Sequence, residues 1–192
     1  MQKKAEINKL RDDPPVWLSQ ANHCHSEHCD QREQDIVDLL VIHNISLPPA
    51  ISEKDFDNDF VEDFFTGKLD SKLHPYFESI ANVRVSSHLY IKRDGTLIQF
   101  VPLNLRAWHA GVSNFKGREK CNDFSIGIEL QGTDDLPFTK AQYNKLVEVT
   151  RQIQGIYPKI KKDNIVGHSD IAPGRKTDPG PCFDWNLYIS QL

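Results

Sequence analysis

Apolar residues fill all but one of the positions from 36 to 42. A run this short and this continuous is typical of a strand buried on both faces, rather than of a helix. His43 and Asn44 follow it directly. Because binding sites are often built where strands end, His43 is either part of such a site or a core histidine that hydrogen-bonds a neighbour.

Alternating apolar and polar residues predict a β-hairpin further along the chain. Residues 83–92 alternate in this way, the turn sequence Asp94-Gly95 follows, and residues 97–101 are again mostly apolar. An Asp-Gly pair between two such segments is a strong signal for two antiparallel strands.

The segment from 125 to 130 predicts another strand, with two different faces. Isoleucine and leucine side chains form one face, while Glu129 shares the other with Ser125 and Gly127. These two small residues leave room for a ligand beside the carboxylate. Since a carboxylate between isoleucines is not an ordinary surface charge, Glu129 is either part of a site or a salt-bridged structural acid.

Helical spacing of apolar residues marks three further stretches. They cover residues 52–67, 71–81 and 139–155. Phenylalanines at helical spacing define the first stretch, and Gly67 is placed to end it. The third stretch opens on the capping box Thr139-x-x-Gln142.

The length of 192 residues indicates one domain that can bury a core without disulfides. Residues 1–34 are polar and contain Pro14-Pro15, so we interpret them as an irregular arm packed on a domain that spans 35–192. Within this arm, the string HCHSEHC from His23 to Cys29 resembles a metal box. No second His/Cys pair follows at zinc-finger spacing, and we therefore favour a solvated loop over a structural metal site.

Charge and composition exclude several classes of partner. A net charge of −4 provides no basic field for nucleic acid, and no lysine-rich amphipathic segment suggests a membrane surface. The N-terminus lacks the apolar core of a signal peptide and no segment is long enough to span a membrane, so we expect a cytoplasmic protein. The four cysteines are too few and too unevenly placed for a disulfide framework, and free thiols are expected. For the quaternary structure, which no pattern addresses, we expect a monomer.

A segment rich in proline and glycine, from 167 to 181, carries three residues with useful chemistry. A short strand predicted over 164–167 leads into His168, and the composition beyond it argues against a regular helix. Pro179 favours an extended conformation at Asp178, so Lys176 and Asp178 should face the same point. Because imidazole and carboxylate bind metals, this loop offers half of a zinc site with a cation beside it.

The strand ends and this loop combine into one predicted zinc site. His43, His168 and Asp178 supply two imidazoles and a carboxylate, the number of ligands that leaves the fourth position of a catalytic zinc ion open for water. Glu129 would take a proton from the attacking water and give it to a leaving amine. Lys176 would stabilise the oxyanion that forms when water attacks a carbonyl. This combination predicts amide hydrolysis by a zinc enzyme.

Four strings lie between about residues 35 and 187: LLVIHNISLPP, RAWHAG, CNDFSIGIELQGTD and GHSDIAPGRKTDPGPCFDW. Together they resemble the N-acetylmuramoyl-L-alanine amidases, specifically the cytosolic enzymes that act on 1,6-anhydro-muropeptides. The resemblance implies an α/β (α+β) domain with a central mixed β-sheet flanked by helices, as in the peptidoglycan-recognition and amidase fold. It implies one Zn²⁺ per chain on His43, His168 and Asp178, with Glu129 as the acid/base and Lys176 as the transition-state cation.

The resemblance also implies a substrate and the residues that contact it. The family cleaves the amide bond between the lactyl group of N-acetyl-(1,6-anhydro)muramic acid and L-alanine, during peptidoglycan recycling. It suggests substrate contacts at Asn44, Arg84, Trp108 and Lys120. Trp108, in the irregular stretch 102–122, would stack on a sugar or be a core tryptophan. Lys120 stands where arginine is expected in close relatives, so it would meet a peptide carboxylate as a point charge. His109 is not a family ligand and is left outside the metal shell.

Two alternative functions compete with this one. Non-catalytic recognition proteins keep the fold as peptidoglycan-binding modules but lack one or more metal ligands. All three ligands, Glu129 and Lys176 are present here, which favours an enzyme. An export-directed amidase that acts on intact cell wall would share the site but would need a signal sequence, which this N-terminus lacks, so that alternative stays open only for a processed N-terminus.

Overall fold

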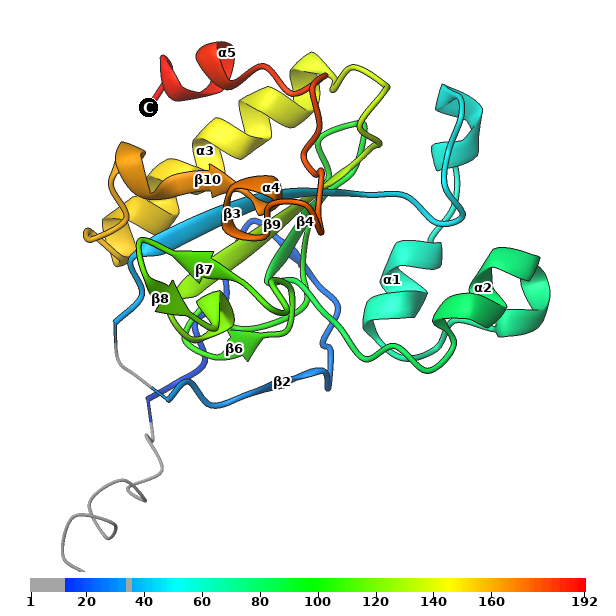
Figure 1. Cartoon of the computed structure of the whole chain (residues 1–192), viewed down its shortest axis with the longest axis horizontal. Helices are drawn as coiled ribbons and strands as arrows, with labels where there is room; N and C mark the ends of the chain where they lie inside the picture. Colours follow the sequence, from blue (N-terminus) through cyan, green and yellow to red (C-terminus); the bar gives the residue numbers. More distant parts are fainter. Residues whose placement is uncertain (1–12, 34–35) are drawn as a thin grey trace, which may run out of the picture.

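The computed structural model describes residues 13–33 and 36–192, which contain a six-stranded mixed sheet with helices on one face and to one side (Figure 1). Its strand order is β1-β5-β4-β9-β3-β10. In that order the strands span Asn22–His23, Leu97–Gln99, Leu89–Ile91, Ser125–Gln131, Leu39–Ile45 and Ile165–Gly167. β4 and β5 are antiparallel, and the other neighbouring pairs are parallel. The predicted α/β domain with a central mixed sheet is confirmed.

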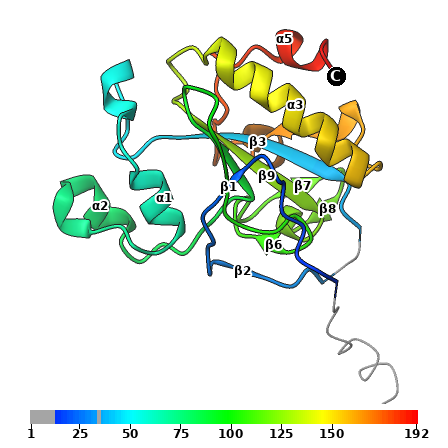
Figure 2. The ribbon, with the colours of Figure 1, turned by 180° about the vertical axis from the view of Figure 1, so that it is seen from behind.

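Helix α3, Lys140–Ile156, covers one face of the sheet, and helix α5, Trp185–Ile189, lies beside α3 on the same side of the sheet (Figures 1 and 2). The predicted capping box is formed, because the Thr139 hydroxyl accepts from Gln142 N and the Gln142 side chain accepts from Thr139 N. Leu146 and Ile153 of α3 belong to the main apolar cluster, together with residues of β3, β4 and β9. This cluster anchors the strands that carry the site.

Strand β3 is buried on both faces, as its apolar run predicts. Its alternate residues belong to two apolar clusters on opposite faces of the sheet: Leu40 and Ile42 to one, Leu39 and Val41 to the other. The predicted limits, 36–42, are wrong by three residues at each end, because the parallel pairing with β9 begins at Leu39 and continues to Ile45. His43 therefore lies inside the strand, near its carboxyl end.

Two short helices, α1 (Phe60–Phe65) and α2 (Pro75–Ile80), lie to one side of the sheet (Figure 2). The single helix predicted over 52–67 is wrong, because α1 is separated from a 3₁₀ turn at Glu53–Phe56. Between them the Asn58 side chain donates to Asp55 O and accepts from Phe60 N, so it replaces helical hydrogen bonds with its own. Gly67, with φ +72°, follows the end of α1 as predicted.

The weaker helical stretch predicted over 71–81 is confirmed as a 3₁₀ turn, Ser71–Leu73, followed by α2. The hairpin of β4 and β5 is also confirmed. Its first strand is shorter than the predicted 83–92, since the backbone N and the hydroxyl of Ser86 donate to carbonyls of two loops outside the sheet. Arg84, expected on this strand, lies in an exposed irregular segment.

Loops and short elements cover the face of the sheet opposite α3 (Figure 1). They include the antiparallel pairs β2 (Cys29–Asp30) with β6 (Arg106–Ala107) and β7 (Asn114–Phe115) with β8 (Arg118–Glu119), the 3₁₀ turn Cys121–Asp123, and helix α4 (His168–Ile171). A further 3₁₀ turn, Lys162–Asn164, connects α3 to β10. The composition of the loop after Gly167 argued against a regular helix, but four of its residues form α4. Asp170 explains this turn, because its carboxylate accepts from Gly167 N and caps it.

Residues 13–33 pack on this domain and contribute β1 and β2, so the predicted irregular arm contains two short strands. Leu18 is buried in the main apolar cluster. The Arg32 guanidinium is also buried and donates to the carbonyls of Asn122, Asp123, Leu103 and Ser125. Residues 1–12 and 34–35 lie outside the described residues, and the division of the chain at 34/35 stays a prediction. All four cysteines are free.

Candidate metal centre and active site

Three neighbouring parallel strands bring His43, Glu129 and His168 to one edge of the sheet. The register of β3 and β9 places His43 opposite Glu129. β10 places Gly167 opposite Ile42, so His168, the next residue, stands beside His43. The carboxyl ends of parallel strands share an edge, where α/β proteins build their sites.

His43, His168 and Asp178 form a compact group of ligand atoms. His43 Nδ1, His168 Nδ1 and Asp178 Oδ2 lie 3.0 Å from one another in all three pairs. Among residues 13–33 and 36–192, this is the one group of three or more His, Cys, Asp or Glu side chains spaced to hold a metal ion. The group can therefore bind a metal ion through three protein ligands.

The protonation of this group suits metal binding. Burial lowers the pKa of His43 to about 4, against an opposing hydrogen bond with Asp178, so the imidazole is neutral at pH 7. Burial alone would raise the pKa of Asp178, but its hydrogen bonds with His168 and His43 hold that pKa well below the usual range. A neutral imidazole and an ionised carboxylate are the forms that bind metals.

Asp178 is held by the turn that contains it. Ser169 N donates to the Asp178 carbonyl at 3.0 Å, which ties this turn to α4. The Asn44 amide donates to Asp134 Oδ1 at 2.7 Å and to Pro179 O at 3.1 Å, so it links the turn to β3. Asp178 is the second residue of the turn that Gly180 N closes on Thr177 O, and Lys176 and Asp178 line one cavity.

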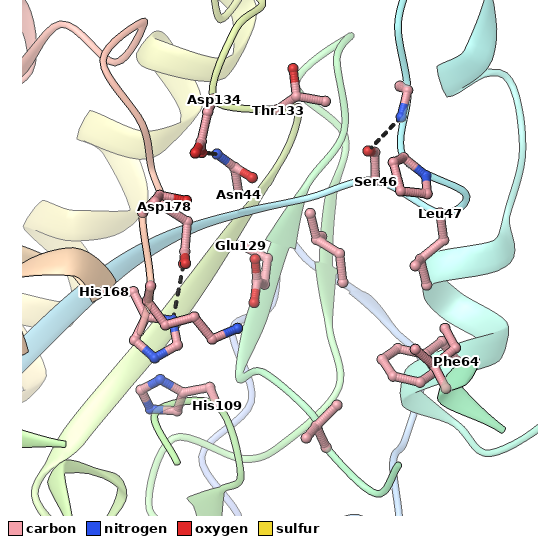
Figure 3. A pocket seen from close by; sticks show the side chains of 18 of the residues that line it. Asn44, Ser46, Leu47, Phe64, His109, Glu129, Thr133, Asp134, His168 and Asp178 are labelled. Atoms are coloured by element: carbon pink, nitrogen blue, oxygen red, sulfur yellow. Dashed lines mark hydrogen bonds and ion pairs between the residues drawn. The ribbon is translucent and has the colours of Figure 1, made fainter. Parts of the chain in front are cut away.

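Glu129 points into the same cavity and is nearly buried, with 8 % of its surface exposed (Figure 3). Its Oε1 lies 3.9 Å from His43 Nδ1, and within the described residues its buried Oε2 has no hydrogen-bond partner. Burial and the nearby Asp178 carboxylate raise the pKa of Glu129 well above its usual value, and Lys176 offsets part of this rise. An unpartnered buried carboxyl oxygen costs about 1–3 kcal/mol, and perturbed carboxyl groups of this kind are common among catalytic acids and bases.

The cavity has a volume of about 690 Å³, within the range of small-molecule sites. On one side lie Glu129, His168 and Asp178, while Leu47 and Phe64 lie on the opposite side (Figure 3). Exposed Lys176 contributes to the rim. A ligand in this cavity would contact polar groups on one side and apolar side chains on the other.

Of the four residues expected to contact substrate, two line the cavity and two do not. Asn44 and Trp108 line the cavity, and the indole N–H of Trp108 donates to Asp30 Oδ1 at 3.2 Å. Arg84 is exposed, is not among the residues that line the cavity, and donates to nearby backbone carbonyls. Lys120 borders a second groove of about 560 Å³, and Arg175 lines both the groove and the cavity. Arg175 is thus the side chain that the two hollows share.

His109 occupies the space that the sequence assigned to a ligand. A Cβ atom added at Gly127 would lie 2.6 Å from Cγ and Nδ1 of His109, so the imidazole fills the gap beside Glu129. His109 Nδ1 lies 2.9 Å from His43 Nε2. The prediction that Gly127 leaves room for a ligand is therefore wrong. Gly127 itself could have indicated this contact, because a glycine inside a strand often marks a position where another group approaches the backbone closely.

Two of the three histidines of the HCHSEHC string make ordinary hydrogen bonds. His23 Nε2 bonds Leu18 O, His28 Nδ1 bonds Val85 O, and Cys29 Sγ donates to Ser26 O. His28 also stacks on Trp108, with 6.2 Å between ring centroids. These contacts agree with the interpretation of the string as a loop rather than a metal box.

Replacing both Cys24 and Cys29 by Ser is therefore expected to leave metal content and activity unchanged. Neither thiol belongs to the metal group, and burial raises the pKa of both, which disfavours the thiolate that binds metal. Metal analysis of the purified double variant checks this. Loss of a second equivalent of metal would establish the string as a structural site.

A family model described as N-acetylmuramoyl-L-alanine amidase matches residues 32–181. The 1,6-anhydro-N-acetylmuramyl-L-alanine amidase AmpD of Haemophilus influenzae is 54% identical over 188 residues, which are 97% of this chain and 100% of that protein.

Solved structures of amidases have a fold similar to that of this chain. A crystal structure of a Se-Met AmpD derivative superposes with a TM-score of 0.87 at 51% identity, and covers 92% of this chain and 96% of the other. The amidase AmiD of E. coli, solved with the substrate anhydro-N-acetylmuramic acid-L-Ala-D-gamma-Glu-L-Lys, has a TM-score of 0.58 at 31% identity. That match covers 81% of this chain and 57% of AmiD.

Proposed function

Since this chain belongs to the N-acetylmuramoyl-L-alanine amidase family, we propose that it is a zinc enzyme that hydrolyses anhydro-muropeptides. The bond cleaved is the amide between the lactyl group of N-acetyl-1,6-anhydromuramic acid and L-alanine. The observation that carries the proposal is the group of His43, His168 and Asp178. His168 and Asp178 line one cavity with Glu129 and Lys176, and buried His43 lies opposite Glu129 in the sheet.

The donor set supports zinc as the ion. The three donor atoms lie 3.0 Å from one another, so one ion could contact all three. Two imidazoles and one carboxylate are also a set that hydrolytic zinc enzymes use with a fourth position left open.

In the proposed mechanism, Glu129 carries the proton. When bound, zinc acts as a Lewis acid and makes a water molecule easier to deprotonate. Glu129 accepts a proton from this water, whose oxygen attacks the lactyl carbonyl carbon. As the carbon–nitrogen bond breaks, Glu129 returns the proton to the amine of L-alanine. The raised pKa of Glu129 suits both steps, because the group must accept a proton and then donate it.

Lys176 is proposed to stabilise the negative charge that develops on the carbonyl oxygen. The positive charge of Lys176 acts on the metal group and on Glu129, because it lowers the pKa of both His43 and Glu129. Lys176→Met is expected to lower kcat by about 10²–10³-fold while zinc content is kept. Lys176→Arg, which retains a cation, is the matched control and should lose less. Equal kcat values for Lys176→Met and the wild type would remove this role.

The same proposal places the protein in the cytoplasm as a monomer, in peptidoglycan recycling. All five residues of the centre come from one chain, so no second subunit is needed to complete it. Within the described residues, none of the helices is long and apolar enough to cross a membrane.

Mass analysis of reaction products tests the choice of substrate. The purified protein is incubated with an anhydromuramyl tripeptide and, separately, with intact sacculi. We expect free tripeptide and anhydromuramic acid derivative from the first substrate and little release from the second. Cleavage of sacculi alone would favour an enzyme that acts on intact wall.

A further inference from the structure

Two consecutive residues, His109 and Ala110, lie within hydrogen-bonding distance of the Nε2 atoms of His43 and His168. His43 Nε2 lies 2.9 Å from His109 Nδ1, and His168 Nε2 lies 3.1 Å from the carbonyl oxygen of Ala110. An imidazole that binds a metal through Nδ1 carries its proton on Nε2. Each ligand histidine therefore has an N–H to donate, and His109 and Ala110 are the acceptors.

The direction of the hydrogen bond between His43 and His109 decides whether His43 can bind metal. If His43 Nε2 donates to His109 Nδ1, the proton of neutral His109 is on Nε2, 3.0 Å from the accepting hydroxyl oxygen of Ser125. The opposite direction would put the His43 proton on Nδ1, between His168 and Asp178, where it would occupy the metal-binding lone pair. Only the first direction leaves the metal group intact.

The segment of His109 and Ala110 is itself fixed by contacts outside the metal group. The side-chain oxygen of Asn122 accepts from His109 N at 3.1 Å and from Ala110 N at 2.7 Å. The His109 ring lies against Gly127, where a Cβ atom would clash with it. His109 is 8 % exposed, and Ala110 is fully buried. The two acceptors are thus held in place by contacts outside the metal group.

We propose that His109 is a positioning residue that, with the Ala110 carbonyl, fixes the tautomer and ring orientation of both ligand histidines. This inference rests on the proposed zinc site and adds the group that orients it. It also assigns a role to the stretch 102–122, predicted to be irregular, which supplies His109, Ala110 and Asn122. Hydrogen-bond partners of metal-binding histidines typically contribute about 10–100-fold to metal affinity.

Two substitutions of His109 separate its hydrogen bond from its volume. His109→Phe fills the space against Gly127 but offers no acceptor to His43. His109→Asn leaves part of the space empty, but its amide oxygen can occupy the place of Nδ1. Zinc dissociation constants are measured on the full chain by competition with a chelator. We expect about 10–100-fold weaker binding for His109→Phe and a change of only a few fold for His109→Asn.

An independent variant and a spectroscopic readout complete the test. Asn122→Leu removes the acceptor that holds residues 109 and 110 without contacting either ligand histidine, and should also weaken zinc binding. In ¹⁵N-labelled, zinc-loaded protein, the Nε2 proton of His43 should exchange slowly in the wild type and faster in His109→Phe.

Each result points in one direction. Equal zinc affinity for the wild type, His109→Phe and Asn122→Leu would overturn the positioning role and leave the zinc site standing. Weaker binding by His109→Asn than by His109→Phe would show that ring volume matters rather than the nitrogen, and would also overturn it. Failure of the wild type to bind zinc would instead overturn the proposed metal site, and this inference with it.

Discussion

Glu129→Ala is expected to lower kcat for an anhydromuramyl peptide by about 10²–10⁴-fold while the protein still binds one zinc ion. The reason is that Glu129 lies beside the metal group without belonging to it. Its Oε1 is 3.9 Å from His43 Nδ1, and its Oε2 has no partner among the described residues. The substitution removes the group that moves the proton and leaves all three ligands in place. Steady-state kinetics and zinc analysis of the same preparation check both parts.

Glu129→Gln is the matched control for this prediction. The amide has nearly the shape of the carboxyl group but cannot accept a proton from water at neutral pH. It should therefore lose about as much activity as the alanine variant. Near-normal hydrolysis by either variant would mean that another group acts as the base.

Asp178→Ala is expected to abolish stable zinc binding, and activity with it. Asp178 Oδ2 is one of three donor atoms that lie 3.0 Å apart, and it supplies the negative charge of the group. The loss should exceed the roughly 10–100-fold that follows removal of an outer hydrogen-bond partner. Zinc content after dialysis against a weak chelator measures it.

Asp178→Asn controls for the packing of the turn, since the amide keeps the size of the carboxylate but not its charge. It should bind zinc more weakly than the wild type and retain the fold, which circular dichroism can verify. If Asp178→Ala keeps one equivalent of zinc through the dialysis, Asp178 is not a ligand.

The positions of His43, His168 and Glu129 could be predicted because each depends on strand geometry. The apolar run before His43, the alternating strand around Glu129 and the short strand before His168 all place a functional residue at or near a carboxyl end. Parallel pairing then brings these ends together. The sheet register adds what the pattern could not give, namely that His43 lies directly opposite Glu129.

His109 could not be assigned from the sequence, because its role depends on a contact between a loop and a strand. The WHAG string is irregular, and nothing in its spacing indicates that the imidazole covers Gly127 and faces His43. The broken helix near Asn58 has a similar origin. There a side chain competes with the backbone for hydrogen bonds, which apolar spacing does not report.

The residues expected to contact substrate were the least predictable. Arg84 and Lys120 lie in irregular segments, so their positions follow from loop conformation rather than from a repeating pattern. The apolar side of the cavity, with Leu47 and Phe64, was equally hidden, because phenylalanines at helical spacing are more often core residues.

Removal and return of the metal tests the central claim most directly. The purified protein is stripped with a strong chelator, and cleavage of an anhydromuramyl tripeptide is followed by mass analysis before and after addition of one equivalent of zinc. We expect no cleavage by the stripped protein and full recovery with zinc. Unchanged cleavage by metal-free protein would contradict the assignment of His43, His168 and Asp178 as the ligands of a catalytic zinc ion.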